Sequence, residues 1–294
     1  MAQTRTGSFP IGFRRGWSDW QRDLGGLIGF AEANDFAFLD FGPAPVEDLR
    51  RVLEAGVRVG SVDLKDWKLL VSPDGERRKV AAEENAAYVR SVAALGVRVF
   101  LTALIPEDPA RPREENFRYA ADAYARLIEA VAATGARVVL EGWPGQAPHF
   151  GTIGCTPADC RAFFEAIGSD AVGVNFDPSH LVRMGIDPVR FVREFAPRIF
   201  HAHAKDTRIT PDELYEHGHL QPATFAKPHA FGGHSWRYAI PSEGDVPWPA
   251  VLGALRDVGY RGLLSIELED ERFNGTTEGE QRALLAARDF LAGV

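Results

Sequence analysis

The chain has 294 residues, of which 45% are hydrophobic and 25% are charged, so it can bury a large core and is neither disordered nor collagen-like. Acidic residues outnumber basic ones by 41 to 33, and the resulting net charge of −8 argues against a nucleic-acid partner. Because we find no long uncharged apolar stretch and no leader-like start, and because there are only two cysteines, we expect a cytoplasmic protein with no membrane partner.

Short apolar runs alternate along the chain with amphipathic stretches of helical period, a pattern typical of repeated βαβ units. The predicted strands span residues 11–14, 36–41, 57–64, 97–103, 137–141, 172–176, 199–204 and 262–267. The predicted helices span residues 19–34, 45–55, 75–95, 114–134, 156–167, 187–196, 247–259 and 277–292. Equal numbers of strands and helices without a linker predict one domain over residues 1–294, a single (β/α)8 TIM barrel. The alternative is a doubly wound sheet with a second domain.

The start of the predicted helix at residue 156 has clear capping chemistry. Thr156 can cap the helix, and Pro157 fits its first turn. In that frame Cys155 and Cys160 take the two positions of a hydrophobic staple, so we interpret both as packing residues without a redox or metal role.

The helical pattern stops between Asp206 and Pro247. Loops between a strand and a helix usually have about 2–6 residues, so we predict a lid-like insertion over roughly residues 207–246, after the seventh strand. Its histidine and aromatic side chains suit a ligand that is neither greasy nor highly charged. The alternative is that this segment forms an interface in a homo-oligomer.

Four consecutive predicted strands end in side chains that can bind a metal. Glu141, Asp177, His203 and Glu267 lie at or next to the C-terminal ends of the fifth to the eighth predicted strand, in that order. In a TIM barrel these strand ends share one rim, and three carboxylates would repel one another there unless a cation lay between them. The sequence therefore predicts one divalent metal. Mixed oxygen and nitrogen ligands favour Mn²⁺ or Zn²⁺, with Co²⁺, Fe²⁺ or Mg²⁺ as further possibilities.

The seventh predicted strand contains two histidines, His201 and His203. We expect only one of them to join the inward-facing set. His203 is preferred because it lies nearer the C-terminal end of the strand, and His201 is interpreted as a wall or core residue.

The strand-end motifs are similar to those of the sugar isomerase/epimerase superfamily with xylose-isomerase-like barrels. The motifs that carry this resemblance are Leu-Glu-Gly-Trp-Pro at 140–144, Asn-Phe-Asp-Pro-Ser-His at 175–180, His-Ala-His-Ala-Lys-Asp at 201–206 and Tyr-Arg-Gly-Leu-Leu-Ser-Ile-Glu at 260–267. The chain is also similar to members called sugar phosphate isomerase/epimerase. The resemblance implies a metal bound by the same four residues, with His180 near the substrate. It also implies that Glu141 and Glu267 exchange a proton with a sugar or keto-sugar through a metal-stabilised enediolate.

Other side chains are candidates for substrate binding. Lys205 and Arg237 could bind a hydroxyl or anionic group, and Trp143, Trp67 and Trp236 could stack against a sugar ring. The alternatives are surface ion pairs for the two basic residues and simple packing for the indoles.

The same resemblance leaves more than one reaction open. The main alternative is a lyase or dehydratase acting on a keto-inositol or a 3-keto-glycoside, including C-glycoside deglycosidases, because that reaction also begins with a proton removed beside a carbonyl. A barrel that binds sugars without turnover is a third possibility. Apurinic endonucleases of the superfamily are disfavoured, because the third and fourth predicted strands end without histidine. Trp143 stands where classical xylose isomerases have a lysine, which favours one metal and proton transfer over a hydride shift.

Overall fold

The computed structural model describes residues 5–6, 9–145, 151–219 and 224–294. Its centre is a closed barrel of eight parallel strands, in which the first barrel strand pairs with both the second and the last. These strands are β2 (Phe9–Arg14), β3 (Phe38–Phe41), β4 (Arg58–Asp63), β5 (Val99–Thr102), β6 (Arg137–Glu141), β7 (Val172–Phe176), β8 (Ile199–Ala204) and β11 (Leu264–Ile266). A two-residue strand, β1 (Arg5–Thr6), pairs antiparallel with β2. The predicted (β/α)8 barrel is confirmed.

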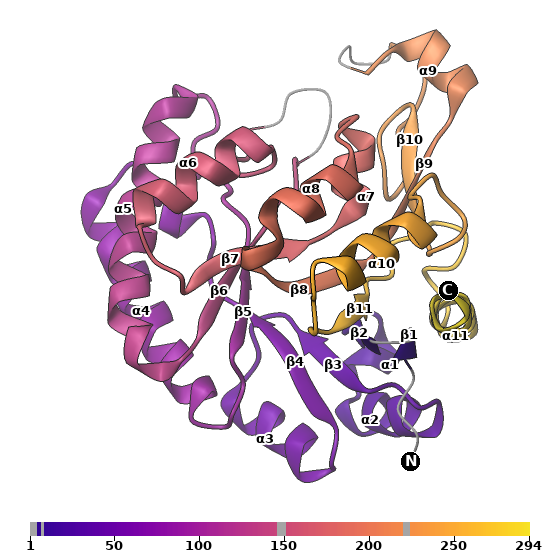
Figure 1. Cartoon of the computed structure of the whole chain (residues 1–294), viewed down its shortest axis with the longest axis horizontal. Coiled ribbons are helices and arrows are strands. Elements are labelled where there is room, and N and C mark those ends of the chain that lie inside the picture. Colours follow the sequence, from indigo (N-terminus) through magenta and orange to yellow (C-terminus); the bar gives the residue numbers. More distant parts are fainter. Residues whose placement is uncertain (1–4, 7–8, 146–150, 220–223) are drawn as a thin grey trace.

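Helices surround the barrel, and Figure 1 shows them as an outer layer around the strands. The longer ones are α2 (Leu24–Ala33), α3 (Val46–Glu54), α4 (Gly75–Ala93), α5 (Arg113–Val131), α6 (Pro157–Ile167), α8 (Pro188–Phe195), α10 (Trp248–Asp257) and α11 (Thr277–Gly293). The shorter ones are α1 (Asp19–Arg22), α7 (Pro178–Arg183), α9 (Pro211–His217), η1 (Leu69–Val71), η2 (Ala132–Thr134) and η3 (Ala196–Arg198). As predicted, Thr156 caps α6 by accepting a hydrogen bond from the Asp159 amide, and Cys155 and Cys160 are buried free thiols.

The helix predicted over residues 19–34 is wrong in one respect, because the structure divides it into α1 and α2. Asp23 stands between them with an extended backbone. Its side chain accepts a hydrogen bond from the Gly25 amide at 3.2 Å, which starts a new helix at that point.

The barrel interior is filled in layers that lead up to the strand ends. The ring of Phe38 lies against Gly12 and Gly60 of the neighbouring strands, where a Cβ would come within 2.6 Å and 2.5 Å of ring atoms. Two residues further along β3, Asp40 contacts His201 of β8 across the barrel at 2.7 Å. Residues two apart on a strand face the same side, so the next layer toward the C-terminal ends includes His203.

The predicted insertion after the seventh barrel strand contains more regular structure than the sequence indicated. It forms an antiparallel ribbon of β9 (Asp206–Ile209) and β10 (Trp236–Ala239), together with α9. Figure 1 shows α9 and this ribbon projecting beside α10. Asp206, at the start of the insertion, connects it to the residues at its end. Its carboxylate accepts hydrogen bonds from the Val246 amide and the Trp248 indole, both at 2.9 Å.

None of the helices in the described parts of the chain has the length and apolar character needed to cross a membrane.

Candidate active site

The structure brings together the four predicted metal ligands at the C-terminal end of the barrel. Glu141 ends β6, Asp177 follows β7 and caps α7, His203 lies in β8, and Glu267 follows β11. One atom from each of the four lies within 4.8 Å of the corresponding atoms of the others. Nδ1 of His203 is 2.8 Å from Oε1 of Glu141, 3.5 Å from Oε2 of Glu267 and 4.0 Å from Oδ2 of Asp177. Atoms bound at about 2.0–2.2 Å to one shared ion would have spacings of this size.

The hydrogen bonding of these side chains fits a metal site. Oδ1 of Asp177 accepts hydrogen bonds from the amide and hydroxyl of Ser179 at 2.9 Å and 2.6 Å. Its other oxygen, Oδ2, is buried without a hydrogen-bond partner among the described residues, and so are both ring nitrogens of His203. Buried polar atoms are normally satisfied. Two of these unsatisfied atoms come from different ligands, Oδ2 of Asp177 and Nδ1 of His203, and lie 4.0 Å apart, a spacing that a shared cation would explain.

The pKa values of these groups reflect the crowding of negative charge. Burial raises the pKa of Asp177 to about 6, with Glu141 and Glu267 adding to the rise and Lys205 opposing it. Burial alone would lower the pKa of His203, but the carboxylates of Glu267 and Glu141 raise it well above its usual value. For Glu267, the raising effect of burial is outweighed by Lys205 and His203, so its pKa lies well below the usual range.

Lys205 belongs to the same centre. It is 2% exposed, and its ammonium lies 2.5 Å from Glu267, 3.1 Å from Glu269 and 3.4 Å from Asp177. The structure therefore gives this predicted substrate-binding residue carboxylate partners within the protein.

A second basic side chain approaches the centre from the first barrel strand. Arg14 pairs with Asp63 at 2.5 Å and reaches Glu267 at 3.3 Å. Among the described residues, Lys205 and Arg14 are the lysine and arginine side chains in ion-pair contact with this group of acids. Because the group comprises Glu141, Asp177, Glu267, Glu269 and Asp63, an excess of negative charge remains.

His180 lies on α7 at the edge of the four-ligand cluster. Its Nε2 is 3.4 Å from Oδ2 of Asp177 and 4.0 Å from Oε1 of Glu141. Its Nδ1 is 2.8 Å from the hydroxyl of Tyr238. Burial, with Lys205 nearby, lowers the pKa of His180 well below the usual value, so the ring is neutral at neutral pH.

The expectation that only one histidine of the seventh barrel strand faces inward is wrong. His201 and His203 are both completely buried, and their ring centroids are 5.7 Å apart. They share a face because they are two residues apart on one strand. They differ in depth, since His201 pairs with Asp40 one layer below the strand-end cluster.

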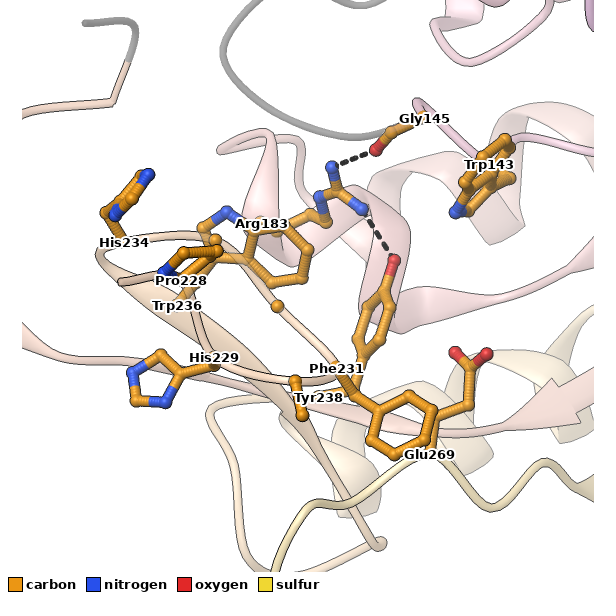
Figure 2. A pocket seen from close by; sticks show the side chains of 13 residues that line it. Trp143, Gly145, Arg183, Pro228, His229, Phe231, His234, Trp236, Tyr238 and Glu269 are labelled. Carbon is orange, nitrogen blue, oxygen red and sulfur yellow. Dashed lines mark hydrogen bonds between the residues drawn. The ribbon is translucent and has the colours of Figure 1, made fainter. Parts of the chain in front are cut away.

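A pocket of about 390 Å³ lies beside the cluster, between the loop after β6 and the insertion. Figure 2 shows its labelled side chains, with Trp143 on one side and Trp236 and Pro228 on the other. Glu269 lines the pocket and contacts Lys205, so the pocket adjoins the acidic centre. Its lining residues are Trp143, Gly145, Arg183, Pro228, His229, Ala230, Phe231, Gly232, Gly233, His234, Trp236, Tyr238 and Glu269.

Three of the predicted substrate-binding residues, Lys205, Arg237 and Trp67, do not line this pocket. Arg237 pairs with Asp270 at 3.3 Å. Trp67 packs against the hydrophobic core in the segment after β4. By contrast, Trp143 and Trp236 are both part of the pocket wall.

The sequence reasoning missed several residues of the site. Arg14 ends the first barrel strand and Asp63 the third, so the strand-end rule used for later strands could have found both. Glu269 lies two residues beyond Glu267, where the same face of an extended chain is expected. Tyr238 belongs to the insertion whose aromatic side chains were expected to suit a ligand, but no local pattern predicted its contact with His180, which depends on the pairing of β10 with β9.

The family model described as xylose isomerase-like TIM barrel matches residues 24–292. The chain belongs to this family. The resemblance inferred from the strand-end motifs is thereby confirmed, and the site described above lies in the position where TIM-barrel enzymes carry their active sites.

Similar proteins were found both by sequence and by structure. A segment of 123 residues, 42% of this chain, is 28% identical to inosose dehydratase of Bacillus thuringiensis (strain Al Hakam) and covers 39% of it. The matched segments span about a third of the length of the curated relatives. D-psicose 3-epimerase from Clostridium cellulolyticum H10, solved with D-tagatose, superposes with a TM-score of 0.71 at 15% identity over 97% of this chain and 98% of that one. The IolI protein with a bound zinc atom has a TM-score of 0.69 at 16% identity over 96% and 98%.

The comparisons therefore show the family and the fold, and the four gathered side chains support a divalent metal at this site.

Proposed function

We propose that this protein is a divalent-metal-dependent isomerase or epimerase of a sugar or keto-sugar that acts by proton transfer. The observation that carries the proposal is the convergence of Glu141, Asp177, His203 and Glu267 beside a pocket with two indole rings. The four side chains would hold the metal. Bound there, a divalent cation would attract the negative charge that develops on a substrate oxygen when a proton leaves the neighbouring carbon. Mn²⁺ and Zn²⁺ stay the preferred ions, because the ligands are mixed oxygen and nitrogen donors.

Glu141 and Glu267 are the proposed proton-transferring groups, and the protein holds them in different ways. Oε1 of Glu141 accepts a hydrogen bond from the amide of Asn175 at 3.0 Å. Glu267 is held by two cations, Lys205 on Oε2 and Arg14 on Oε1, and its low pKa keeps it ionised. Two carboxylates in unlike surroundings can take unlike roles in a two-step proton transfer.

The pocket supplies binding and orientation. Trp143 and Trp236 offer apolar faces of the kind that pack against the carbon face of a sugar ring. The insertion forms much of the wall, including Phe231, which supports its proposed role as a lid that keeps water from the reacting carbon.

A lyase or dehydratase acting on a keto-inositol or 3-keto-glycoside is the second candidate. The sequence similarity to inosose dehydratase favours it. Both reactions start with removal of a proton beside a carbonyl, and they differ in whether the carbon regains a proton or a neighbouring group leaves.

Incubation in D₂O with a panel of ketoses, keto-inositols and 3-keto-glycosides, followed by NMR, distinguishes the candidates. Deuterium in a product with an intact carbon skeleton and all hydroxyls supports the isomerase or epimerase. An unsaturated product or a released aglycone supports the lyase. Metal binding with neither deuterium exchange nor an elimination product from any compound of the panel would contradict both and favour a sugar-binding protein. Enzyme stripped with a chelator and then reloaded with Mn²⁺ or Zn²⁺ is the control for metal dependence.

A further inference from the structure

Next to the four-ligand cluster lies a hydrogen-bonded chain that the proposed function does not use. Arg183 donates from Nη1 to the hydroxyl of Tyr238 at 2.6 Å, and that hydroxyl lies 2.8 Å from Nδ1 of His180. Figure 2 shows the Arg183 guanidinium joined to Tyr238 and to the Gly145 carbonyl. The guanidinium is 3.7 Å from the Trp236 ring centroid, so it is held in place from a third side.

The direction of each hydrogen bond follows from the chemistry of the donors. A guanidinium can only donate, so the Tyr238 oxygen accepts from Arg183. The single proton of the hydroxyl is then free to point at His180, and Nδ1 must accept it. If Nδ1 carried a proton instead, the tyrosine oxygen would accept twice and its own buried proton would lack an acceptor among the described residues.

The other nitrogen of His180 therefore carries the ring proton. Nε2 is buried, has no hydrogen-bond partner among the described residues, and faces the cluster. The nearby oxygens of Asp177 and Glu141, at 3.4 Å and 4.0 Å, favour a proton at that position.

We propose that Arg183 and Tyr238 are positioning residues, whose hydrogen bonds place the ring proton of His180 on Nε2 and leave no lone pair there for a metal. His180, which the family resemblance places near the substrate, would then donate from Nε2 to a substrate oxygen. A metal would need the lone pair of Nε2, and this tautomer does not provide it there. The part of the inference that concerns the substrate rests on the proposed function, whereas the part that concerns the tautomer does not.

The tautomer is tested directly by long-range ¹H–¹⁵N NMR of protein labelled with ¹⁵N-histidine, without added metal. The His180 signals are assigned by their loss in His180→Gln. We expect Nδ1 to resonate as an unprotonated nitrogen and Nε2 as a protonated one. A protonated Nδ1 in the unsubstituted protein would overturn the inference. This measurement requires no substitution of Arg183 or Tyr238.

Tyr238→Phe tests what sets the tautomer. The substitution removes the hydroxyl, so the two His180 nitrogens should move toward averaged shifts. Tyr260→Phe is the matched control, since Tyr260 is also a buried tyrosine whose hydroxyl bonds elsewhere, to the Leu263 carbonyl. Unchanged His180 chemical shifts in Tyr238→Phe would show that the hydrogen bonds through Tyr238 do not determine the tautomer.

Metal titration and kinetics test the donor role. With Mn²⁺ as the probe, His180→Gln should keep the metal stoichiometry, whereas His203→Gln should lose it. Equal loss in both would overturn the statement that His180 is no ligand. With metal saturating, Tyr238→Phe should lower kcat at least tenfold and leave metal affinity within about twofold. An unchanged kcat despite an altered tautomer would overturn the donor role. Absence of turnover in the unsubstituted protein would instead refute the proposed function, and the NMR result would stand.

Discussion

Lys205 is the residue whose surroundings differ most from what its place in the sequence indicates. The Lys205-Asp206 pair after a strand looks like a polar loop segment, but the ammonium is buried among Glu267, Glu269 and Asp177. These carboxylates raise the pKa of Lys205 well above its usual value despite burial. Lys205 therefore acts as an internal counter-ion at the place where a metal would add further positive charge.

Lys205→Met should destabilise the metal-free protein by about 3 kcal/mol, because it leaves buried carboxylates without a partner. It should also tighten Mn²⁺ binding, since one competing positive charge is lost. Urea unfolding with and without Mn²⁺ measures both effects, and Lys205→Arg, which keeps the charge, is the control. Equal stability of the Met variant and the unsubstituted protein would contradict this assignment.

Glu141 and Glu267 each have two proposed roles, as a metal ligand and as a proton-transferring group. Glu141→Gln or Glu267→Gln should reduce deuterium exchange into substrate by a factor of at least about 100 while the barrel stays folded. Exposed Glu165 on α6 allows a matched control, Glu165→Gln, which should be neutral. Near-normal exchange in either active-site variant would rule out its proposed role.

At the level of elements, the carboxylate of Glu280 connects the last helix, α11, to the segment that follows β2. Oε2 of Glu280, near the start of α11, accepts hydrogen bonds from Ser18, Trp20 and Gln21 at 2.6, 2.7 and 3.0 Å. Burial opposes ionisation, but these donors lower the pKa of Glu280 below its usual value. The contact helps to close the ring of helices where the two ends of the barrel sequence meet.

Glu280→Gln should destabilise the protein by about 1–3 kcal/mol at pH 7, because an amide nitrogen would replace an acceptor among buried donors. A carboxylate whose folded-state pKa is lowered stabilises the fold above its unfolded pKa, and this contribution is lost as pH falls through the folded value. The difference in unfolding free energy between the two proteins should therefore shrink as pH falls below about 4. A difference that is constant from pH 7 to pH 3 would contradict the role of the ionised carboxylate.

For the whole molecule, the negative charge is concentrated where the barrel opens. The chain has a net charge of −8, and a group of its carboxylates lies at the C-terminal ends of the strands with Lys205 and Arg14 as basic partners. Bringing these acids together costs free energy that the rest of the barrel must supply. A cation bound by the folded state alone would recover part of that cost.

A saturating divalent metal should therefore raise the melting temperature. At about 100 times the Kd, binding stabilises the folded state by about 2.7 kcal/mol, which is a shift of roughly 5 °C for a domain of this size. Thermal unfolding with Mn²⁺ or Zn²⁺, reversed by a chelator, is the measurement. His203→Gln should show no shift, and a shift of the same size in that variant would place the metal elsewhere.

Much of the fold could be predicted from the sequence, because its signals are local. The apolar runs correspond to the barrel strands, and the Thr156-Pro157 start of α6 was visible in its capping residues. The strand-end rule also identified the four proposed ligands, since parallel strands in a barrel must end at one rim. The missed interruption at Asp23 is a case in which one capping side chain outweighs a continuous helical pattern.

The sequence by itself determined that the chain forms a barrel and that Glu141, Asp177 and Glu267 lie at strand ends, because the hydrophobic period and the end of each strand can be read from neighbouring residues. Only the tertiary structure decided which groups balance and orient those acids. Arg14 ends β2 and Lys205 follows β8, far apart in sequence, and Tyr238 reaches His180 through pairing within the insertion. Such contacts depend on the register between distant segments, which no local pattern in the chain encodes.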